Sequence, residues 1–319
     1  MRGIPIGLFL LKRFATFIAT LLAASAVIFA VLDVLPGNVA EVMLGESATP
    51  QSLQALNAKL GLDRPPLARY GAWMSGLATG DMGVSVAYDT PVIELVKERL
   101  GVTLPLALMA MALTTLVALA LGLYAASRHN RLGDVGVMVL SQVGIAVPSF
   151  WLAILLVWVF AVKLHWVSAG GFPGWDDSLW EGIKALLLPA TALAVFQTAI
   201  LARITRSAVL EVLREDFVRT ARAKGLSQRQ VLWRHVLRNA FVAVLTVMGL
   251  QFANLLAGTV IVESVFSLPG LGRLIFQAIL NRDLVVVRNI VMLLAAAVIL
   301  INFVVDVLYV VIDPRLRTR

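Results

Sequence analysis

The side chains that most often do chemistry in proteins are thinly spread along this sequence. The chain has no cysteine, and His129, His165 and His235 stand in three separate segments without a His-Glu-x-x-His spacing. A zinc site needs such ligands close together. No serine, histidine and aspartate form a hydrolase-like grouping, and no Gly-x-x-x-x-Gly-Lys-Ser/Thr loop is present to hold a nucleotide phosphate. The sequence therefore predicts no catalytic residue, no metal site and no cofactor held by this chain.

Carboxamide side chains inside long apolar runs form the second group of candidates. They are Gln142, Gln197, Gln251, Asn254 and Asn302. Inside a bilayer, such groups either hydrogen-bond between packed helices or line the path of a solute. We treat the five as candidate lining of a substrate pathway, with helix packing as the alternative interpretation.

Basic residues gather in the segment 208–240, which separates two apolar runs. Arg219, Arg222 and Lys224 precede Gly225, where a helix is expected to end in a left-handed conformation. The apolar face of that helix is marked by five residues: Val209, Leu210, Leu213, Phe217 and Ala221. Glu215 lies one turn from Arg219, which predicts an ion pair. Ser227 to Gln230 has the form of a capping box, so a second helix is expected to start there.

This helix–glycine–helix arrangement has three interpretations. It superficially resembles a DNA-binding helix-turn-helix. However, both ends lead into apolar runs within a few residues, and no third helix is left to complete such a domain. The second interpretation is a solvated basic loop. The third, which we favour, is a rigid element that docks onto a cytoplasmic partner.

The elements that position these residues are membrane-spanning helices. Hydrophobic residues make up 60% of the 319-residue chain and charged residues 14%, whereas soluble domains have roughly 45–50% and 25%. A bilayer core needs about 20 apolar residues per helix. Uncharged stretches predict six spans: Phe14–Leu32, Val102–Ser127, Val135–Val162, Ala185–Ala202, Asn239–Val262 and Asn289–Val305. The fold class is therefore an all-α, polytopic membrane protein.

The first apolar run has a second interpretation as a cleaved secretory signal, because Ala24-Ser25-Ala26 has the form of a cleavage site. The run continues to Val34, which is long for a signal core and favours a retained span.

Charge placement predicts the orientation. If both termini are cytoplasmic, the inner segments 2–13, 128–134, 203–238 and 313–319 hold 17 of the 27 Lys and Arg residues. The two short outer loops hold five, and the rest lie in the long outer loop 33–101, which can be translocated regardless of charge. The last span continues past Asp306 to Ile312, and Asp306, about two turns from the inner end, is the one charge inside a predicted span. We expect it to serve helix packing rather than ion coupling.

The chain divides into residues 1–100, the first span with its outer loop, and residues 101–319, a five-helix core with the basic segment. Within the outer loop, Leu53, Leu56 and Leu60 recur at helical spacing before Gly61. A second stripe after Pro66 comprises Leu67, Tyr70, Met74 and Leu77. Two short helices are expected, packed on the membrane domain.

The basic segment resembles the EAA loop of ATP-binding-cassette (ABC) importer permeases, which have the type I architecture. The similar residues are Arg219-Thr220-Ala221-Arg222-Ala223-Lys224-Gly225, with Leu226 following, and then His235-Val236-Leu237-Arg238-Asn239. Arg219 replaces the usual glutamate, Thr220 the first alanine and Arg238 the proline. These departures resemble the B-type permease of dipeptide, oligopeptide, glutathione and nickel importers.

The resemblance extends over nearly the whole chain through six further motifs in the family's order. They are 35–38 (Leu-Pro-Gly-Asn), 60–65 (Leu-Gly-Leu-Asp-Arg-Pro), 80–83 (Gly-Asp-Met-Gly), 147–152 (Val-Pro-Ser-Phe-Trp-Leu), 262–272 (Val-Glu-Ser-Val-Phe-Ser-Leu-Pro-Gly-Leu-Gly) and 313–316 (Asp-Pro-Arg-Leu).

The resemblance implies a bacterial inner-membrane permease that translocates a peptide-like solute by alternating access. It implies four kinds of partner: a second permease, two ATP-binding subunits that carry ATP and Mg²⁺, an extracytoplasmic solute-binding protein and the lipid bilayer, with no nucleic acid. The helix around Arg219–Leu226 would sit in a groove of an ATP-binding subunit, with Ala221 and Ala223 small enough for close approach. An ion-gradient-driven transporter remains the alternative outside this family.

Overall fold

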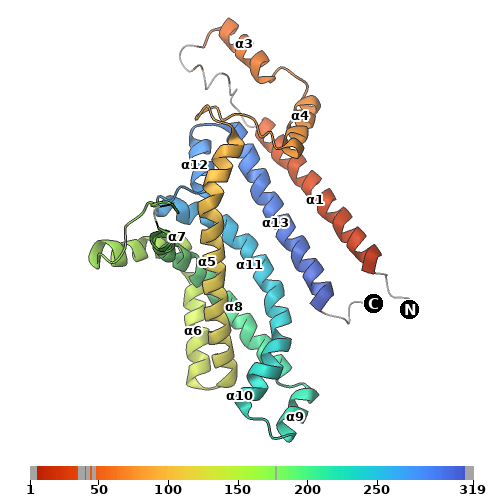
Figure 1. Ribbon diagram of the computed structural model, residues 1–319, viewed down its shortest axis with the longest axis vertical. Helices are drawn as coiled ribbons and strands as arrows, with labels where there is room; N and C mark the ends of the chain where they lie inside the picture. Colours follow the sequence, from red (N-terminus) through yellow and green to blue (C-terminus); the bar gives the residue numbers. More distant parts are fainter. Residues whose placement is uncertain (1–5, 35–39, 41–43, 45–47, 177, 313–319) are drawn as a thin grey trace.

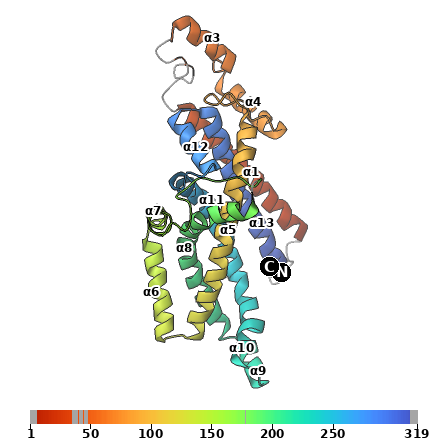
Figure 2. The same cartoon turned by 60° about the vertical axis from the view of Figure 1, so that its left-hand side comes forward.

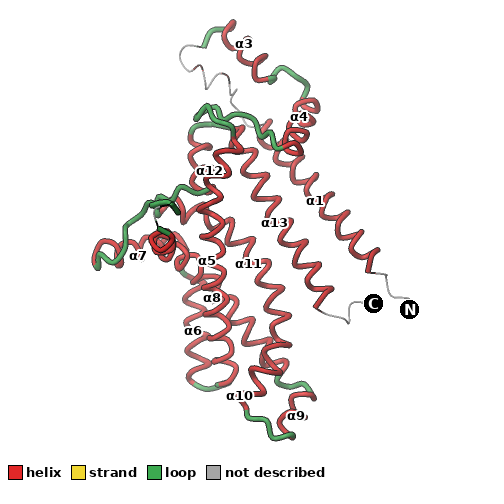
Figure 3. Tube along the Cα trace, in the orientation of Figure 1, coloured by secondary structure: helices red, strands yellow, loops and turns green. Residues whose placement is uncertain are grey.

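The computed structural model describes residues 6–34, 40, 44, 48–176 and 178–312. The motifs at 35–38 and 313–316 lie outside these residues. The described part of the chain is built from helices, with one isolated bridge between Val84 and Pro91 (Figure 3). Long helices run along the molecule, α3 and α4 lie at one end, and α9 and α10 lie at the other (Figure 1). Following the predicted orientation, we call these the outer and inner ends.

Five of the predicted spans are confirmed as single long apolar helices. Their apolar segments are Leu10–Asp33 in α1 (Ile6–Val34), Val92–Ser127 in α5, Leu179–Val212 in α8, Gln228–Val265, which includes α11 (Leu237–Val265), and Leu284–Val307 in α13 (Leu284–Ile312). Each of the four spans after α1 starts before the predicted first residue, because polar helical turns continue beyond the apolar core.

The predicted span 135–162 is not one straight helix. It consists of α6 (Leu132–Ala146) and α7 (Ser149–Leu156), continued by the π-helical η2 (Val157–Lys163), with a bend of 97° between the two halves. The break lies at Val147–Pro148, where proline removes a backbone donor and disfavours the helical conformation of the preceding residue. The bend is visible when Figures 1 and 2 are compared. The described part of the chain therefore has six spans only if this broken pair counts as one.

Helices α5 and α8 form the most extensive contact in the molecule, and small side chains make it possible. A Cβ added at Gly122 of α5 would lie 2.8 Å from the carbonyl oxygen of Ala202 on α8. Small residues allow close backbone approach in membranes, where packing rather than water exclusion holds helices together. Around this contact, Leu106, Leu186 and Leu255 join α5, α8 and α11 in one buried cluster.

Helix α1 lies at the edge of the molecule. Of the residues in its most apolar 18-residue stretch, only 6% are buried within the chain, and its main neighbour is α13. Near the inner end, Arg13 forms an ion pair of 2.9 Å with Asp306. Asp306 thus joins two helices, in agreement with its expected packing role.

The outer loop contains the two expected helices, α3 (Pro50–Leu60) and α4 (Pro66–Thr79). Gly61 ends α3 at a φ of 66°, and Gly80 ends α4 at 83°. The predicted apolar stripe of α4 omitted its most buried residue, Trp73, whose Nε1 donates to Asn289 Oδ1 at 3.0 Å. In contrast, Leu67 is 85% exposed. Packing against α13 determines which residues of α4 are buried, and the spacing of residues along α4 alone does not reveal that packing.

A buried carboxylate at the outer end holds α12 (Leu271–Leu280) against two spans. Glu263, on the last turns of α11, accepts from Thr103 Oγ1 of α5 at 2.6 Å and from the amide of Gly272 at 2.7 Å. Gly270 is needed beside it, because a Cβ there would overlap the carboxylate. Glu263 lies just beyond the predicted span 239–262, on the turn by which α11 continues past its apolar core.

Candidate coupling segment and substrate pathway

The basic segment between α8 and α11 is divided differently from the prediction. Instead of one helix through Val209 and Ala221, α8 (Leu179–Val212) ends, a turn follows, and α9 (Asp216–Ala223) begins after Glu215. Gly225 follows α9 with φ of 82°, so the predicted left-handed end is confirmed. Helix α9 lies at the inner tip of the molecule (Figure 1).

Helix α9 is fixed to its own chain by one apolar face. Val218 and Ala221 are buried in a cluster with residues of α5, α8 and the start of the next helix. Phe217, predicted on the buried face, is instead 41% exposed, because the turn before α9 breaks the helical register. The proposed role of Ala221 in close approach of a partner also needs correction, since its small side chain packs inward, whereas Ala223 is exposed.

The remaining predicted docking residues are presented to the surroundings. Arg219, Thr220, Arg222, Ala223, Lys224 and Gly225 are all exposed, and Leu226 is half-buried. Arg219 lies 3.7 Å from Asp216 rather than pairing with Glu215, which precedes the helix. Its side chain remains 80% exposed, so this pair leaves the guanidinium accessible to a partner.

The second half of the segment begins as predicted. Ser227 accepts from the amide of Gln230, whose side chain accepts from the Ser227 amide, so the capping box is confirmed. The π-helical η3 (Val231–Val236) follows α10 (Gln228–Gln230) and continues directly into α11. Residues 228–265 therefore form one helical run, which the short turn 224–227 joins to α9.

The prediction missed Trp233 of η3, a helix that contacts α9, and 58% of the surface of Trp233 is exposed. Together with Phe217, it adds exposed aromatic surface to the inner end. The sequence contained a hint of this residue, because a tryptophan stands between Leu232 and Arg234 in a stretch of apolar and basic residues. Exposed aromatic and arginine side chains are typical of the centres of protein interfaces.

Near the same end, a buried ion pair joins the start of α6 to α8. Arg206 donates from Nη2 to Asp134 Oδ2 at 2.7 Å and from Nε to Oδ1. The amide of Asn130 also donates to Asp134, at 3.0 Å. Asp134 is 3% exposed. This bidentate pair fixes the broken span relative to α8, and it was not predicted because its members lie 72 residues apart.

The structure brings three of the five pathway candidates together. A cavity of about 350 Å³ lies beside the break between α6 and α7, and Gln197 of α8 and Asn254 of α11 line it. Gln251 donates to the Gln197 carbonyl at 2.9 Å. The Oε1 atoms of Gln197 and Gln251 are buried without a hydrogen-bond partner among the described residues. Such acceptors favour a polar ligand or water nearby.

The other two candidates lie elsewhere. Gln142 lines a separate hollow with Asp134 and Arg206, and Asn302 is on α13, outside both cavities. Of the five candidates, only Gln197, Gln251 and Asn254 are brought together at one cavity.

Comparison with known proteins identifies the family. Residues 118–318 match the model of the binding-protein-dependent transport system inner membrane component, and residues 7–107 match the N-terminal model of such components. The chain belongs to this family. It is a multi-pass inner-membrane permease of the ABC importer class.

Similar sequences cover nearly the whole chain. A putative peptide transport system permease protein of Brucella abortus is 44% identical over 97% of this chain and 98% of its own. The dipeptide permease DppB of Alkalihalophilus pseudofirmus is 39% identical over 96% and 98%. The glutathione permease GsiC of Escherichia coli is 38% identical over 98% and 99%.

A solved structure supports the fold. The inward-facing MetNI methionine ABC transporter matches 69% of this chain and 97% of its own with a TM-score of 0.57 at 18% identity.

Proposed function

We propose that this permease imports a peptide-like solute, such as a dipeptide, an oligopeptide or glutathione. The observation that supports this substrate class is the shared identity of 38–44% with peptide, dipeptide and glutathione permeases across nearly the full length. The buried Oε1 atoms of Gln197 and Gln251 are acceptors that could receive hydrogen bonds from peptide N–H groups during passage.

In this proposal the chain pairs with a second permease, two ATP-binding subunits dock at the inner end, and a solute-binding protein delivers the cargo at the outer end. ATP and Mg²⁺ belong to the ATP-binding subunits. The exposed face of α9 provides the docking contact, with Arg219, Arg222 and Lys224 facing acidic groups of the partner. Closure of the ATP-binding subunits moves α9, and the connection through η3 passes this movement to α11.

Gly225→Val tests the coupling role of α9. A Cβ at Gly225 would meet no atom within 4 Å, so the change acts through the backbone, where a left-handed L-residue costs roughly 1–2 kcal/mol. Relief of that strain would reorient α9. We expect normal accumulation of the protein, while transport and the stimulation of ATP hydrolysis by loaded solute-binding protein fall at least roughly tenfold, since 1.4 kcal/mol of lost contact is tenfold.

Gly80→Val is the matched control at the outer end. Gly80 also follows a helix, has φ of 83°, and would place its Cβ in open space. Its substitution carries the same backbone cost without touching α9, and transport should persist. Ala223→Glu, which adds a negative charge to the exposed basic face of α9, should behave like Gly225→Val. Full stimulated transport in both α9 variants would refute the docking role.

The rival function, ion-gradient-driven transport, predicts uptake by the purified chain alone in liposomes. Our proposal predicts none without the ATP-binding subunits and ATP.

A further inference from the structure

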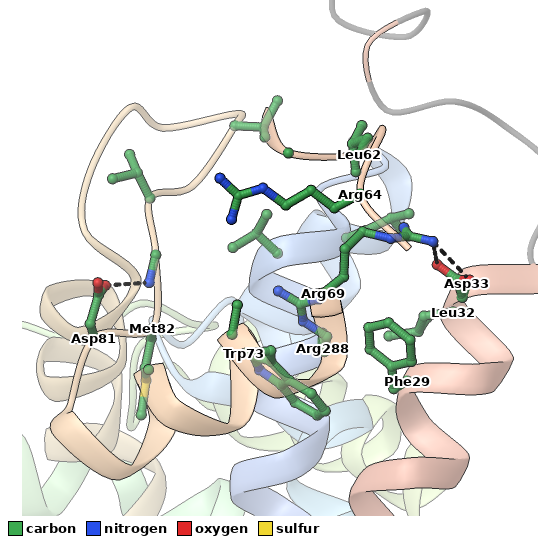
Figure 4. Close-up of a pocket in the computed structure, with 18 residues that line it drawn as sticks. Phe29, Leu32, Asp33, Leu62, Arg64, Arg69, Trp73, Asp81, Met82 and Arg288 are labelled. Carbon is green, nitrogen blue, oxygen red and sulfur yellow. Dashed lines mark hydrogen bonds and ion pairs between the residues drawn. The ribbon is translucent and has the colours of Figure 1, made fainter. Parts of the chain in front are cut away.

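A charged cavity of about 460 Å³ opens at the outer end, away from the pathway. Its walls are the last turns of α1, helix α4, the start of α13 and the loops at 61–64 and 81–86 (Figure 4). Its lining includes no residue of the spans α5 to α8 or of α11, which carry the pathway residues Gln197, Gln251 and Asn254. It is therefore separate from the site of transport.

The charges in this cavity do not balance. Arg69 pairs with Asp33 at 2.7 Å, and the carboxylate of Asp81 accepts from the amide of Gly83 at 2.9 Å. Arg64 and Arg288 also line the cavity, and neither forms an ion pair with any residue that the structure describes. Figure 4 shows Arg69 turned toward Asp33, with Arg64 and Arg288 extending into the space beside it.

Arg288 is held in an orientation suited to an anion. Its guanidinium lies 4.8 Å from the ring centre of Trp73. Trp73 is fixed by its hydrogen bond to Asn289, which in turn donates to the carbonyl of Met82 at 2.7 Å. A guanidinium over an aromatic ring keeps its N–H groups free for a phosphate or carboxylate. Its Nε is buried without a hydrogen-bond partner in the described part of the chain.

The cavity lies at the outer ends of two spans, α1 and α13, where the headgroup region of a bilayer is expected. Arg288 lies four residues after the start of α13, about 6 Å along the helix axis. Phe29 and Leu32, both half-buried, form the opposite wall on the last turns of α1, and the Phe29 ring packs on Tyr70 and Trp73. The site thus combines cationic donors with an apolar wall on α1, the helix at the edge of the molecule. A soluble anion would not need this apolar wall.

We propose that this cavity binds the phosphodiester headgroup of an anionic phospholipid. Arg64 and Arg288 contact the phosphate, and an acyl chain extends along α1 past Phe29 and Leu32. The bound lipid would fill the space between α1, α4 and α13, which the described side chains leave open.

The test uses the purified full-length chain in detergent, with phosphatidylglycerol and phosphatidylcholine added at equal concentrations. Native mass spectrometry counts the retained lipids. The wild-type protein should retain one phosphatidylglycerol in preference to phosphatidylcholine. Arg64→Gln and Arg288→Gln should each weaken retention about fivefold or more, as expected for one basic residue near an anionic lipid. Arg64 is exposed, so its variant is expected to fold even if the Arg288 variant does not.

Lys97→Gln is the matched control, because Lys97 is an exposed basic residue of α5 outside the cavity. It should leave lipid retention unchanged. Equal loss in the control, or full retention in Arg64→Gln, would overturn the proposal. Displacement of the bound lipid by millimolar inorganic phosphate would also overturn it, since the site would then select free phosphate.

Discussion

Two acidic residues at the outer end of the permease and the basic residues of α9 at the inner end have opposite surroundings. At the outer end, Glu263 and Asp283 are fully buried, and each accepts hydrogen bonds from neighbouring segments. On α9 at the inner end, Arg219, Arg222 and Lys224 are exposed, and only Arg219 has an acidic neighbour in the described chain, a loose contact with Asp216. The two buried outer carboxylates therefore join parts of one chain, whereas the basic residues of α9 are available to another molecule.

We therefore expect that removing a buried outer carboxylate harms the fold, whereas changing the surface of α9 harms the contact with a partner. The largest effect is expected for Glu263→Ala. This change leaves the Thr103 hydroxyl and the amides of Gly272 and Arg273 without their acceptor.

Each buried donor left unpaired costs about 1–3 kcal/mol, so Glu263→Ala should lower the free energy of unfolding by about 3 kcal/mol or more. Size-exclusion chromatography after heating, with the intrinsic fluorescence of the protein as readout, would measure the loss of folded material. Glu94→Gln, an exposed carboxylate of α5, is the control and should match the wild-type protein. Unchanged thermal stability of Glu263→Ala would show that the carboxylate does not brace the outer end.

A smaller effect is expected for Asp134→Ala, which tests whether a buried ion pair also stabilises the inner end. Arg206 would lose its bidentate partner, but its side chain is 20% exposed and can reach water. We expect a loss of about 2 kcal/mol, within the range for a hydrogen bond to a charged group. The same thermal assay applies. Joint replacement of Asp134 and Arg206 by alanine should destabilise less than the sum of the single changes. Additive losses would argue against a direct pair.

The smallest effect is expected for Asp306→Asn. Its ion pair with Arg13 is 39–44% exposed at the side chains, and exposed pairs contribute about 0–1 kcal/mol. Stability should change within this range, and the pH profile of transport should keep its shape. Disappearance of a titration step in the variant would instead implicate Asp306 in proton movement.

These residues also show what the sequence can and cannot predict. The glycines after α3 and α9 and the capping box at Ser227 were predicted correctly, because helix ends depend on conformational preferences within a few residues. The bend at Pro148 was missed, although proline was visible, because a proline inside α8, Pro189, leaves that helix unbroken. Tertiary packing decides between these outcomes.

Pairings between distant segments were not predicted at all. The contact of Asp134 with Arg206 and that of Thr103 with Glu263 join residues 72 and 160 positions apart. The inward orientation of Ala221 likewise depends on packing against α5 and α8. Local patterns identified the docking segment, but the face of α9 that is available to a partner required the three-dimensional structure.

The central claim is that the exposed basic face of α9 contacts an ATP-binding subunit. A photo-crosslinking amino acid placed at Arg222, with Lys97 of the outer part of α5 as the control position, tests it directly in membranes that contain the assembled transporter. We expect a crosslink to the ATP-binding subunit from position 222 and none from position 97. Absence of the crosslink from position 222 in a transporter that remains active would show that α9 does not contact the ATP-binding subunit.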